Sequence, residues 1–355
     1  MTIDSITYSK FRNISSQTIE PSSGVTLLYG KNAEGKTNAL EGMYLFAYGR
    51  SFRASKEREM ISFGEDIARL QMSYTDKRRQ NEREIILSSG GKRLLKHNGN
   101  IVKKMSEFTG DFRCVLFCPN HLAIVRSGPA ERREFLDTAI AQLSRSYLSE
   151  RQRYDKILNE RNNLIKSCFE NRKNFEDTVD IWSQQLAKSS EIIAKERYEY
   201  TERLSVAVSE LFSDMTSDRE KVILRYTEPK TAEEYFTLLQ SNHEKEIRAG
   251  ATLYGVHHDD ISISLNGKSA RLYCSQGQMR SVALAMKLAE GRLSSDITGD
   301  SPVFLLDDVL SELDAERRKF ILEGITGKQV IITGCDFFEG ADKCYIVKNG
   351  FYEKQ

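Results

Sequence analysis

The sequence lacks the features that would place the chain in a membrane or in an oxidising compartment. No apolar run approaches the roughly 20 residues that a membrane-spanning helix needs. Residues 1–5 (MTIDS) lack the basic and then apolar regions of a secretion signal. The six cysteines are scattered, at Cys114, Cys118, Cys168, Cys274, Cys335 and Cys344. Because disulfide frameworks and zinc sites need paired spacings, we expect buried thiols in a reducing cytoplasm.

The overall charge gives little direction either. A net charge of +1 is uninformative, because phosphate binding depends on where the Lys and Arg side chains lie. Two local clusters are candidates for a nucleic-acid surface: Arg50, Arg53, Lys56 and Arg58, and then Lys77, Arg78, Arg79, Arg93, Lys96, Lys103 and Lys104. A solvated charged face is the commoner explanation of such clusters, so charge alone does not decide.

Residues 30–37 fit the phosphate-binding pattern G-x-x-x-x-G-K-[ST]. They are Gly30, Lys31, Asn32, Ala33, Glu34, Gly35, Lys36 and Thr37. Residues 24–30 predict a strand that runs into this loop, and residues 36–48 predict the helix that follows it. In this setting the pattern is a credible nucleotide site. Backbone N–H groups would bind phosphate oxygens, helped by the positive end of the helix.

Further side chains complete the expected chemistry. Lys36 would reach the β and γ phosphates of ATP, and the Thr37 hydroxyl would help to coordinate Mg²⁺. Far along the chain, the apolar strand 303–306 is followed by Asp307 and Asp308. Asp307 would hold the Mg²⁺ shell, and Asp308 would orient or deprotonate the attacking water. We therefore expect Lys36 and Asp308 to be catalytic, and Thr37 and Asp307 to be metal ligands.

Residues 275–278 (SQGQ) admit two interpretations. Ser275, with Gln278 three residues later, has the pattern of a capping box at the start of an apolar helix. A capped helix start is also a phosphate site, and the phosphate loop elsewhere in the chain favours this second interpretation. Because Lys36 occupies one side of the γ phosphate in its own subunit, we expect Ser275 to reach ATP bound to a second copy. The predicted nucleotide-binding residues here are Ser275, Gln276, Gly277 and Gln278.

The remaining segments predict strands and two long helices. Residues 2–9 predict a strand, and residues 67–104 predict an antiparallel lobe with a hairpin at Asn98-Gly99. Residues 131–170 and 179–212 carry apolar side chains every three or four positions, which predicts an antiparallel pair of amphipathic helices.

The helical pair is interrupted by charge and followed by shorter elements. Glu150 and Arg161 fall on the seam between the helices, which favours a short arm over a long coiled coil. Beyond it the pattern predicts a strand at 221–226, a helix at 232–240, and strands at 261–265 and 270–273.

The fold class expected from these elements is α/β. At 355 residues, with 39% hydrophobic and 29% charged residues, the chain has room for about two domains. We predict a composite ATPase head, residues 1–125 and 252–355, with a mixed-sheet phosphate-loop core and an antiparallel β lobe. Residues 126–251 would form an inserted, mainly helical arm domain.

Taken together, the motifs resemble those of the RecF family, recombination mediators within the ABC/SMC-type ATPases. The resemblance runs nearly end to end. It rests on Phe11-Arg12-Asn13, the phosphate loop with Asn38, Leu40 and Glu41, residues 49–53 (GRSFR), residues 128–129 (GP) with 132–137 (RREFLD), residues 275–278 and residues 305–314 (LLDDVLSELD). The last run is the most specific, because other ABC proteins usually have Glu where Asp308 stands.

The resemblance implies an ABC-type ATPase head that dimerises with ATP and binds DNA. It also implies recombinase loading at gapped DNA in partnership with RecO and RecR proteins, and a place in the cytoplasm at the nucleoid. Arg12, Asn13 and Asn38 would then belong to the nucleotide site. Asp308 is one methylene shorter than Glu, so we expect slow, switch-like hydrolysis.

Several positions depart from the family pattern. Residues 119–121 read Pro-Asn-His where Pro-Glu-Asp is usual, and residues 255–260 read GVHHDD where GPHRDD is typical. Cys335 stands where transporters carry a γ-phosphate-sensing His. The departures lie outside the phosphate loop and leave Asp307 unchanged.

Two other classes of protein remain as alternatives. A transport ATPase subunit would couple to a membrane partner through the helical region, but the absence of a sensing His near Thr333 argues against it. A small-molecule kinase with a phosphate loop would not explain residues 275–278 followed by the 307–314 run. DNA-stimulated hydrolysis and salt-sensitive DNA binding would separate the first interpretation from both.

Overall fold

The structure, a computed structural model, describes residues 1–337 and 339–355 and divides into two compact units. The head unit comprises Met1–Leu122, Glu210–Glu220 and Ser275–Gln355, and the arm unit comprises Ala123–Ser209 and Lys221–Cys274. The predicted boundary at 251/252 differs from the division at Cys274. The reason is strand pairing: β10 (Ile261–Leu265) pairs with β9 (Val222–Tyr226), which holds this segment in the arm unit.

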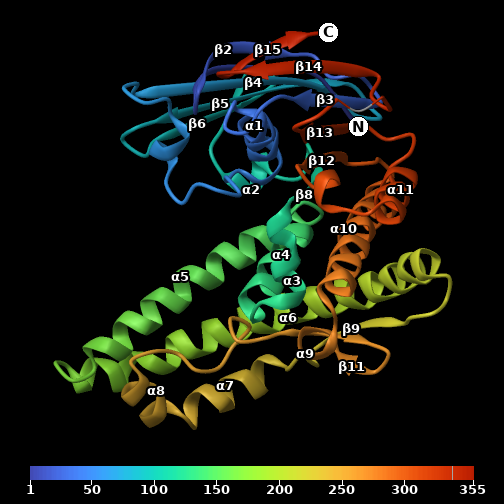
Figure 1. The fold of residues 1–355 in the computed structure, drawn as a ribbon. Coiled ribbons are helices and arrows are strands. Elements are labelled where there is room, and N and C mark those ends of the chain that lie inside the picture. Colours follow the sequence, from blue (N-terminus) through green and yellow to red (C-terminus); the bar gives the residue numbers. More distant parts are fainter. Residues whose placement is uncertain (338) are drawn as a thin grey trace. The chain divides into compact units, whose positions relative to one another are not determined.

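The head unit contains an antiparallel sheet in the order β2-β1-β4-β5-β6-β7. Four of its strands, β2, β4, β5 and β6, are labelled in Figure 1. Its strands are β1 (Thr2–Phe11), β2 (Ile14–Ile19), β4 (Ile67–Thr75), β5 (Gln80–Ser88), β6 (Arg93–His97) and β7 (Asn100–Val102). The predicted hairpin is confirmed: Asn98 and Gly99 have φ of 50° and 78°, as a two-residue hairpin turn between β6 and β7 requires.

The second sheet of the head unit is mixed, in the order β15-β14-β3-β13-β12-β8. Its strands are β3 (Val25–Tyr29), β8 (Cys114–Phe117), β12 (Val303–Asp307), β13 (Val330–Gly334), β14 (Lys343–Lys348) and β15 (Phe351–Lys354). All neighbours pair in parallel except β14 and β15. Parallel pairing brings the carboxyl ends of β3, β12 and β13 to one edge, which is where such sheets bind ligands.

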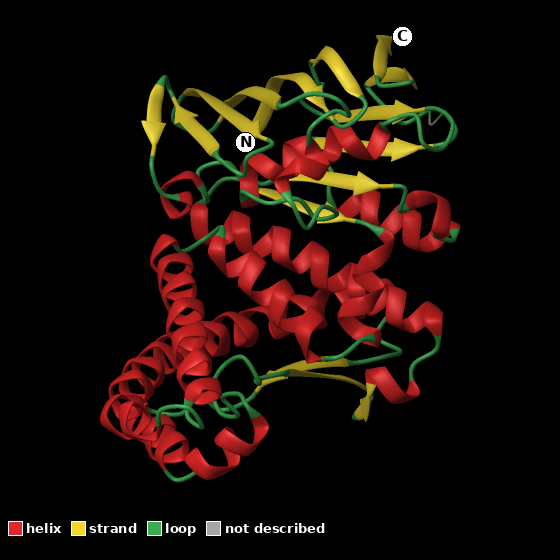
Figure 2. Cartoon of the chain, turned by 90° about the vertical axis from the view of Figure 1, so that its left-hand side faces the viewer, coloured by secondary structure: helices red, strands yellow, loops and turns green. Residues whose placement is uncertain are grey.

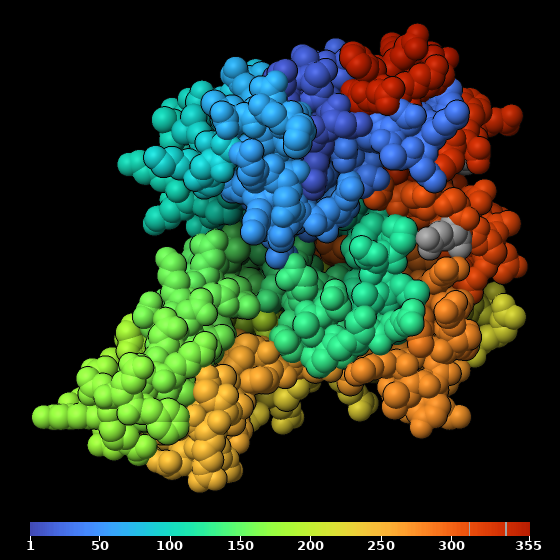
Figure 3. Space-filling view, turned by 60° about the vertical axis from the view of Figure 1, so that its left-hand side comes forward, coloured from blue at the N-terminus to red at the C-terminus, as the bar shows by residue number. Residues whose placement is uncertain are grey.

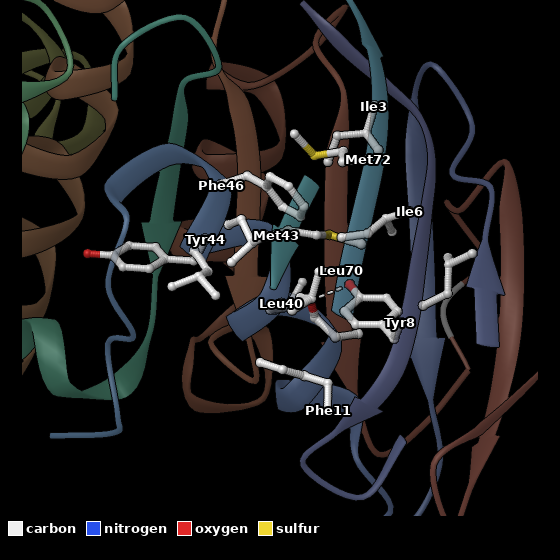
Figure 4. Close-up of a cluster of buried hydrophobic side chains, with 14 of the residues drawn as sticks. Ile3, Ile6, Tyr8, Phe11, Leu40, Met43, Tyr44, Phe46, Leu70 and Met72 are labelled. Carbon is white, nitrogen blue, oxygen red and sulfur yellow. Dashed lines mark hydrogen bonds between the residues drawn. The ribbon is translucent and has the colours of Figure 1, made fainter. Parts of the chain in front are cut away.

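Helix α1 (Lys36–Tyr48) contacts strands of both sheets and is buried almost all round. Figure 4 shows its side chains Leu40, Met43 and Phe46 among Ile6, Tyr8 and Leu70 of the antiparallel sheet. A helix that is apolar on every side belongs in a core. The helix that follows the phosphate loop is therefore fixed between the two sheets.

The opposite face of the mixed sheet is covered by α10 (Gln276–Thr298) and α11 (Ala315–Gly324), with Leu284, Leu288 and Ile321 in the core against it. The head unit also has short helices: α2 (Met105–Phe108), η1 (Glu57–Met60), η2 (Pro119–Leu122) and η3 (Leu310–Glu312). In Figure 3 the red C-terminal residues lie against the dark blue N-terminal segment, as the contact between β15 and β2 requires.

The arm unit is mainly helical (Figure 2). Its elements are α3 (Ala123–Arg126), α4 (Pro129–Ala141), α5 (Arg145–Ser167), α6 (Arg172–Thr216, whose last turns belong to the head unit), α7 (Ala232–Gln240), α8 (His243–Ala249), α9 (Ala270–Tyr273) and a sheet in the order β11-β10-β9, with β11 at Lys268–Ser269. The seam residue Arg161 of α5 is fully buried and pairs with Glu246 at 2.6 Å.

Two sequence predictions in this unit were wrong. The helix expected over 131–170 breaks into α4 and α5, because Ser144 takes an extended conformation and caps α5 by accepting a hydrogen bond from the Tyr147 N–H. The strand expected at 270–273 is the helix α9. Asn266 and Gly267 turn the chain early, so the returning strand is only β11. The predicted helix at 232–240 is confirmed as α7.

Candidate nucleotide site

Residues 30–35 form a tight loop from β3 into α1. Gly30, Ala33 and Gly35 have φ of 154°, 68° and 112°. A Cβ added at Gly30 would lie 2.4 Å from the Val347 carbonyl oxygen, and one at Gly35 would lie 2.6 Å from Asn13 Oδ1. Both glycines are therefore required by positive φ and by close packing. The start of α1 has no side-chain cap, and its N–H groups at Asn38 and Ala39 donate to the Gly35 carbonyl oxygen at 3.0 and 3.3 Å. The N–H groups of the first turn before them remain for a ligand.

Lys36 lies inside this loop. Its side chain is buried, and its ammonium donates to the carbonyl oxygens of Gly30 and Lys31, the latter at 2.9 Å. The thiol of Cys335, at the end of β13, is 3.9 Å from the ammonium and 3.1 Å from Asn32 Oδ1. A buried cation beside uncapped backbone N–H groups is an arrangement suited to phosphate oxygens.

Asp307, at the end of β12, is hydrogen-bonded to side chains of α1 and β13. The hydroxyls of Thr37 and Thr333 donate to its Oδ1 at 2.7 and 2.9 Å. Burial raises the pKa of the Asp307 carboxyl, partly opposed by these two hydrogen bonds. The three side chains come from α1, β12 and β13, so the parallel sheet brings together groups that are distant in sequence.

Asp308 follows with a positive φ of 53°, which Asp tolerates better than most residues. Its N–H donates to Thr333 Oγ1 at 3.0 Å, and Ser311 Oγ lies 3.1 Å from its carboxylate. The turned backbone separates the carboxylates of Asp307 and Asp308.

The donor set at Thr37 and Asp307 fits Mg²⁺. Among the described residues no group of three or more His, Cys, Asp or Glu side chains could hold a metal by itself. Mg²⁺ commonly takes one or two protein oxygens and completes its shell with phosphate and water. Thr37 Oγ1 and Asp307 Oδ1, 2.7 Å apart beside the phosphate loop, would supply the two protein oxygens.

The phosphate loop is also hydrogen-bonded to the C-terminal hairpin of β14 and β15. The Gly350 N–H donates to the Glu34 carbonyl oxygen at 2.8 Å, and the Tyr352 hydroxyl donates to that of Gly35 at 2.8 Å. The Asn349 N–H bonds to the Glu34 carboxylate. The sequence does not predict this support, because nothing in residues 349–352 signals which strand the hairpin will lie beside.

Arg12, Asn13 and Asn38 line a pocket next to the phosphate loop. Asn13 donates to the Glu34 carbonyl oxygen at 3.1 Å and accepts from Asn38 at 2.8 Å. With Arg53, Arg58 and Phe63 they line an open pocket of about 510 Å³. The Arg12 guanidinium is bound on two sides, to the Glu41 carboxylate and to the Glu59 carbonyl oxygen at 2.6 Å.

Residues 275–278 are organised separately. Ser275 Oγ accepts from the Gln278 N–H at 3.2 Å, and Gln278 Oε1 accepts from the Ser275 N–H at 2.9 Å, so the capping box is formed. The Gln278 amide N–H also binds Glu220. Within the described part of the chain, no hydrogen bond or ion pair joins Ser275, Gln276, Gly277 or Gln278 to residues 30–38. Hydrogen bonds thus join Thr37 to Asp307, and Asn13 to both Glu34 and Asn38, whereas residues 275–278 have none to the loop among the described residues.

The two basic clusters differ in how far they are already paired. In the first cluster Arg53, Lys56 and Arg58 are all exposed, and Arg53 donates to Asn38 Oδ1 at 2.9 Å. In the second cluster, Arg93 pairs with Glu57 at 2.6 Å and Lys96 with Glu84 at 2.8 Å. Arg53, Arg93 and Lys96 therefore have roles within the fold.

Comparison with known proteins identifies the family. Residues 2–350 match the family described as the RecF/RecN/SMC N terminal domain. The chain is 36% identical over 360 residues to the DNA replication and repair protein RecF of Lachnoclostridium phytofermentans, covering 100% of both chains. It is 34% identical over 361 residues to that of Clostridium novyi, covering 99% of both. The chain belongs to the RecF family.

Solved structures agree with this assignment. The "recombination mediator protein RecF-ATP in RecFOR pathway" is 33% identical, with a TM-score of 0.94, over 100% of this chain and 97% of that one. An Smc head bound to the C-winged helix domain of ScpA, 16% identical with a TM-score of 0.59, shows the shared fold alone. The predicted ABC-type ATPase head fold is confirmed. In the part of the chain that the structure describes, no helix is long and apolar enough to cross a membrane.

Proposed function

We propose that this protein is an ATP-dependent DNA-binding protein of recombinational repair and replication-fork maintenance. The cluster of Lys36, Thr37 and Asp307 carries the proposal, because it joins the phosphate loop to the acidic strand end. The RecF-ATP relative supports ATP as the nucleotide. The transporter alternative is not favoured, since the full-length relatives are repair proteins.

In this mechanism the loop N–H groups and Lys36 would bind the phosphates, and Thr37 and Asp307 would hold Mg²⁺. The ion would neutralise charge on the β and γ phosphate oxygens. Asp308, whose backbone is fixed by Thr333, orients the attacking water or accepts its proton. Its short side chain makes hydrolysis slow, so the bound nucleotide acts as a switch.

The site is completed by a second copy of the chain. Residues 275–278 are capped on themselves and make no hydrogen bond to their own phosphate loop in the described structure. We therefore place them against ATP held by the partner's loop. ATP binding drives head-to-head dimerisation on DNA, and hydrolysis releases it, which promotes recombinase loading at gapped DNA.

RecO and RecR proteins are the proposed partners, since the solved relatives are assigned to the RecFOR pathway. DNA would be met by exposed basic side chains, among them Lys56 and Arg58. Such contacts make DNA affinity fall steeply with salt.

The test is hydrolysis and DNA binding measured together. We expect ATP hydrolysis to rise on adding gapped duplex DNA, and DNA binding to require ATP and to weaken between 50 and 200 mM salt, about the range over which phosphate contacts are usually lost. Hydrolysis unaffected by DNA, with no ATP-dependent DNA binding, would refute the proposal.

A further inference from the structure

Glu41 is a fully buried carboxylate in α1, one turn beyond the phosphate loop. Arg12 holds it with two parallel hydrogen bonds, Nε to Oε2 at 2.8 Å and Nη2 to Oε1 at 2.6 Å. The Ser51 hydroxyl donates to Oε1, and Arg53 Nη1 lies 3.9 Å from Oε2. One buried charge is thus shared by three groups from two different parts of the chain.

These contacts fold the basic segment 49–60 onto α1. Ser51 Oγ, held by Glu41, accepts from the N–H groups of Arg53 and Ala54 at 2.8 and 2.7 Å. Farther along the segment, the Glu59 carbonyl oxygen accepts from Arg12 Nη1 at 2.6 Å. The segment is therefore attached to the Glu41–Arg12 pair near both of its ends, and its exposed Lys56 lies between the two attachments.

The other side of the pair faces the nucleotide site. Asn13, next to Arg12 in sequence, contacts the Glu34 carbonyl oxygen of the phosphate loop. Arg53 donates to Asn38, which in turn donates to Asn13. Because a buried carboxylate that loses a cationic partner is strongly destabilised, the partners of Glu41 cannot shift independently. A displacement of the basic segment must move Arg12, or break a costly contact.

We propose that Glu41 is a positioning residue that couples the basic segment 49–60 to the nucleotide site through Arg12. Glu41 itself touches neither DNA nor nucleotide. Through Glu41, binding of a DNA backbone to the segment shifts the positions of Arg12 and Asn13. Asn13 in turn contacts the phosphate loop at Glu34. This inference rests on the proposed function, in which that loop binds ATP and the segment meets DNA.

The test uses Glu41→Gln, which keeps the size of the side chain but removes its charge. In the full-length protein we expect ATP affinity without DNA to fall roughly tenfold, because Arg12 loses its two hydrogen bonds to a charged carboxylate and is no longer held in place. We expect kcat without DNA to change little, and stimulation of hydrolysis by DNA to be lost. Arg12→Gln should also lower ATP affinity and DNA stimulation, and for these two quantities the double variant should be no worse than either single variant, because the two residues act as one unit. Glu41→Asp, which restores the charge, should recover part of the DNA stimulation.

Glu84→Gln is the matched control. Glu84 is also a buried carboxylate with two basic partners, Arg69 and Lys96, but it lies in the antiparallel sheet on β5. It should lower thermal stability without changing ATP affinity or DNA stimulation. The inference is overturned if Glu41→Gln behaves like this control, or if its effect and that of Arg12→Gln add. If the wild type shows no stimulation by DNA, the proposed function fails instead, and the ATP-affinity comparison still tests Glu41.

Discussion

The phosphate loop and the 275–278 segment differ in how complete they are within one chain. The loop is hydrogen-bonded to Asn13 and to the C-terminal hairpin, and its last residue, Thr37, donates to Asp307. Residues 275–278 begin a 23-residue helix, close a capping box on themselves, and contact Glu220. The first region is a candidate nucleotide site whose contacts all lie within one chain. The second presents a helix start that its own chain does not use for the loop.

This contrast supports the proposal that the second half of the site comes from a second chain. A helix start is a ready anion site, and a formed capping box keeps it in shape without a ligand. A substitution in the loop should therefore abolish nucleotide binding itself. A substitution at residue 275 should spare binding and affect only assembly.

The largest expected effect comes from Lys36→Met. Removing the ammonium should weaken ATP binding by roughly 100-fold, because charged hydrogen bonds to phosphate are lost. Titration calorimetry with ATP measures this directly. Lys343→Met, which removes a lysine bonded to the Glu20 carbonyl oxygen, should leave the affinity unchanged. Normal affinity in the Lys36 variant would mean that the loop is not the site.

Asp308→Asn should slow ATP hydrolysis on the order of 100-fold, as expected when a general base is removed. Binding should survive, because Lys36, Thr37 and Asp307 are untouched. With ATP, light scattering should then show a long-lived dimer. A variant that stays monomeric at saturating ATP would count against the assignment of Asp308 and against assembly around ATP.

Ser275→Arg should lower dimer affinity by more than about tenfold, since a bulky cation would stand where two chains are to meet. ATP affinity of the monomer should remain within a factor of about three of wild type. Analytical ultracentrifugation and calorimetry report the two quantities separately. The control is Ser262→Arg, at an exposed serine on β10. Loss of ATP binding in the Ser275 variant alone would place this residue in the site of its own chain.

The smallest effect is expected from Ser275→Ala, which removes the hydroxyl that caps α10 without adding bulk or charge. Loss of an N-cap costs about 1 kcal/mol, so dimer affinity should fall about fivefold. Hydrogen exchange should report faster opening of the first turn of α10. If dimerisation were unchanged while that turn frayed, the serine would serve the helix alone.

The phosphate loop and the elements on either side of it could be predicted from the sequence. The pattern of residues 30–37, the strand before it and the helix after it all depend on neighbours in sequence, and α1 lies where it was expected. Asp307 could be placed beside Thr37 because parallel strands end at a common edge. The capping box of Ser275 and Gln278 was likewise readable, as a local pattern.

Long-range contacts could not be predicted in this way. Tyr352 reaches the phosphate loop only because β14 pairs with β3, and Arg12 meets Glu41 only because β1 crosses α1. The break at Ser144 was hidden by apolar spacing that continues through it, because the periodicity cannot distinguish one helix from two in line. Such features depend on which elements pack together, and single-sequence periodicity does not contain that information.

The central claim is that Lys36 of one chain and Ser275 of another serve the same nucleotide. The most direct measurement is light scattering with ATP on the Lys36→Met and Ser275→Arg variants, alone and mixed in equal amounts. Each alone should stay monomeric. A mixed pair retains one intact site, from the loop of the Ser275 variant and the 275–278 segment of the Lys36 variant, so the mixture should form ATP-dependent dimers. If the mixture stays monomeric under conditions in which the wild type dimerises, the account is contradicted.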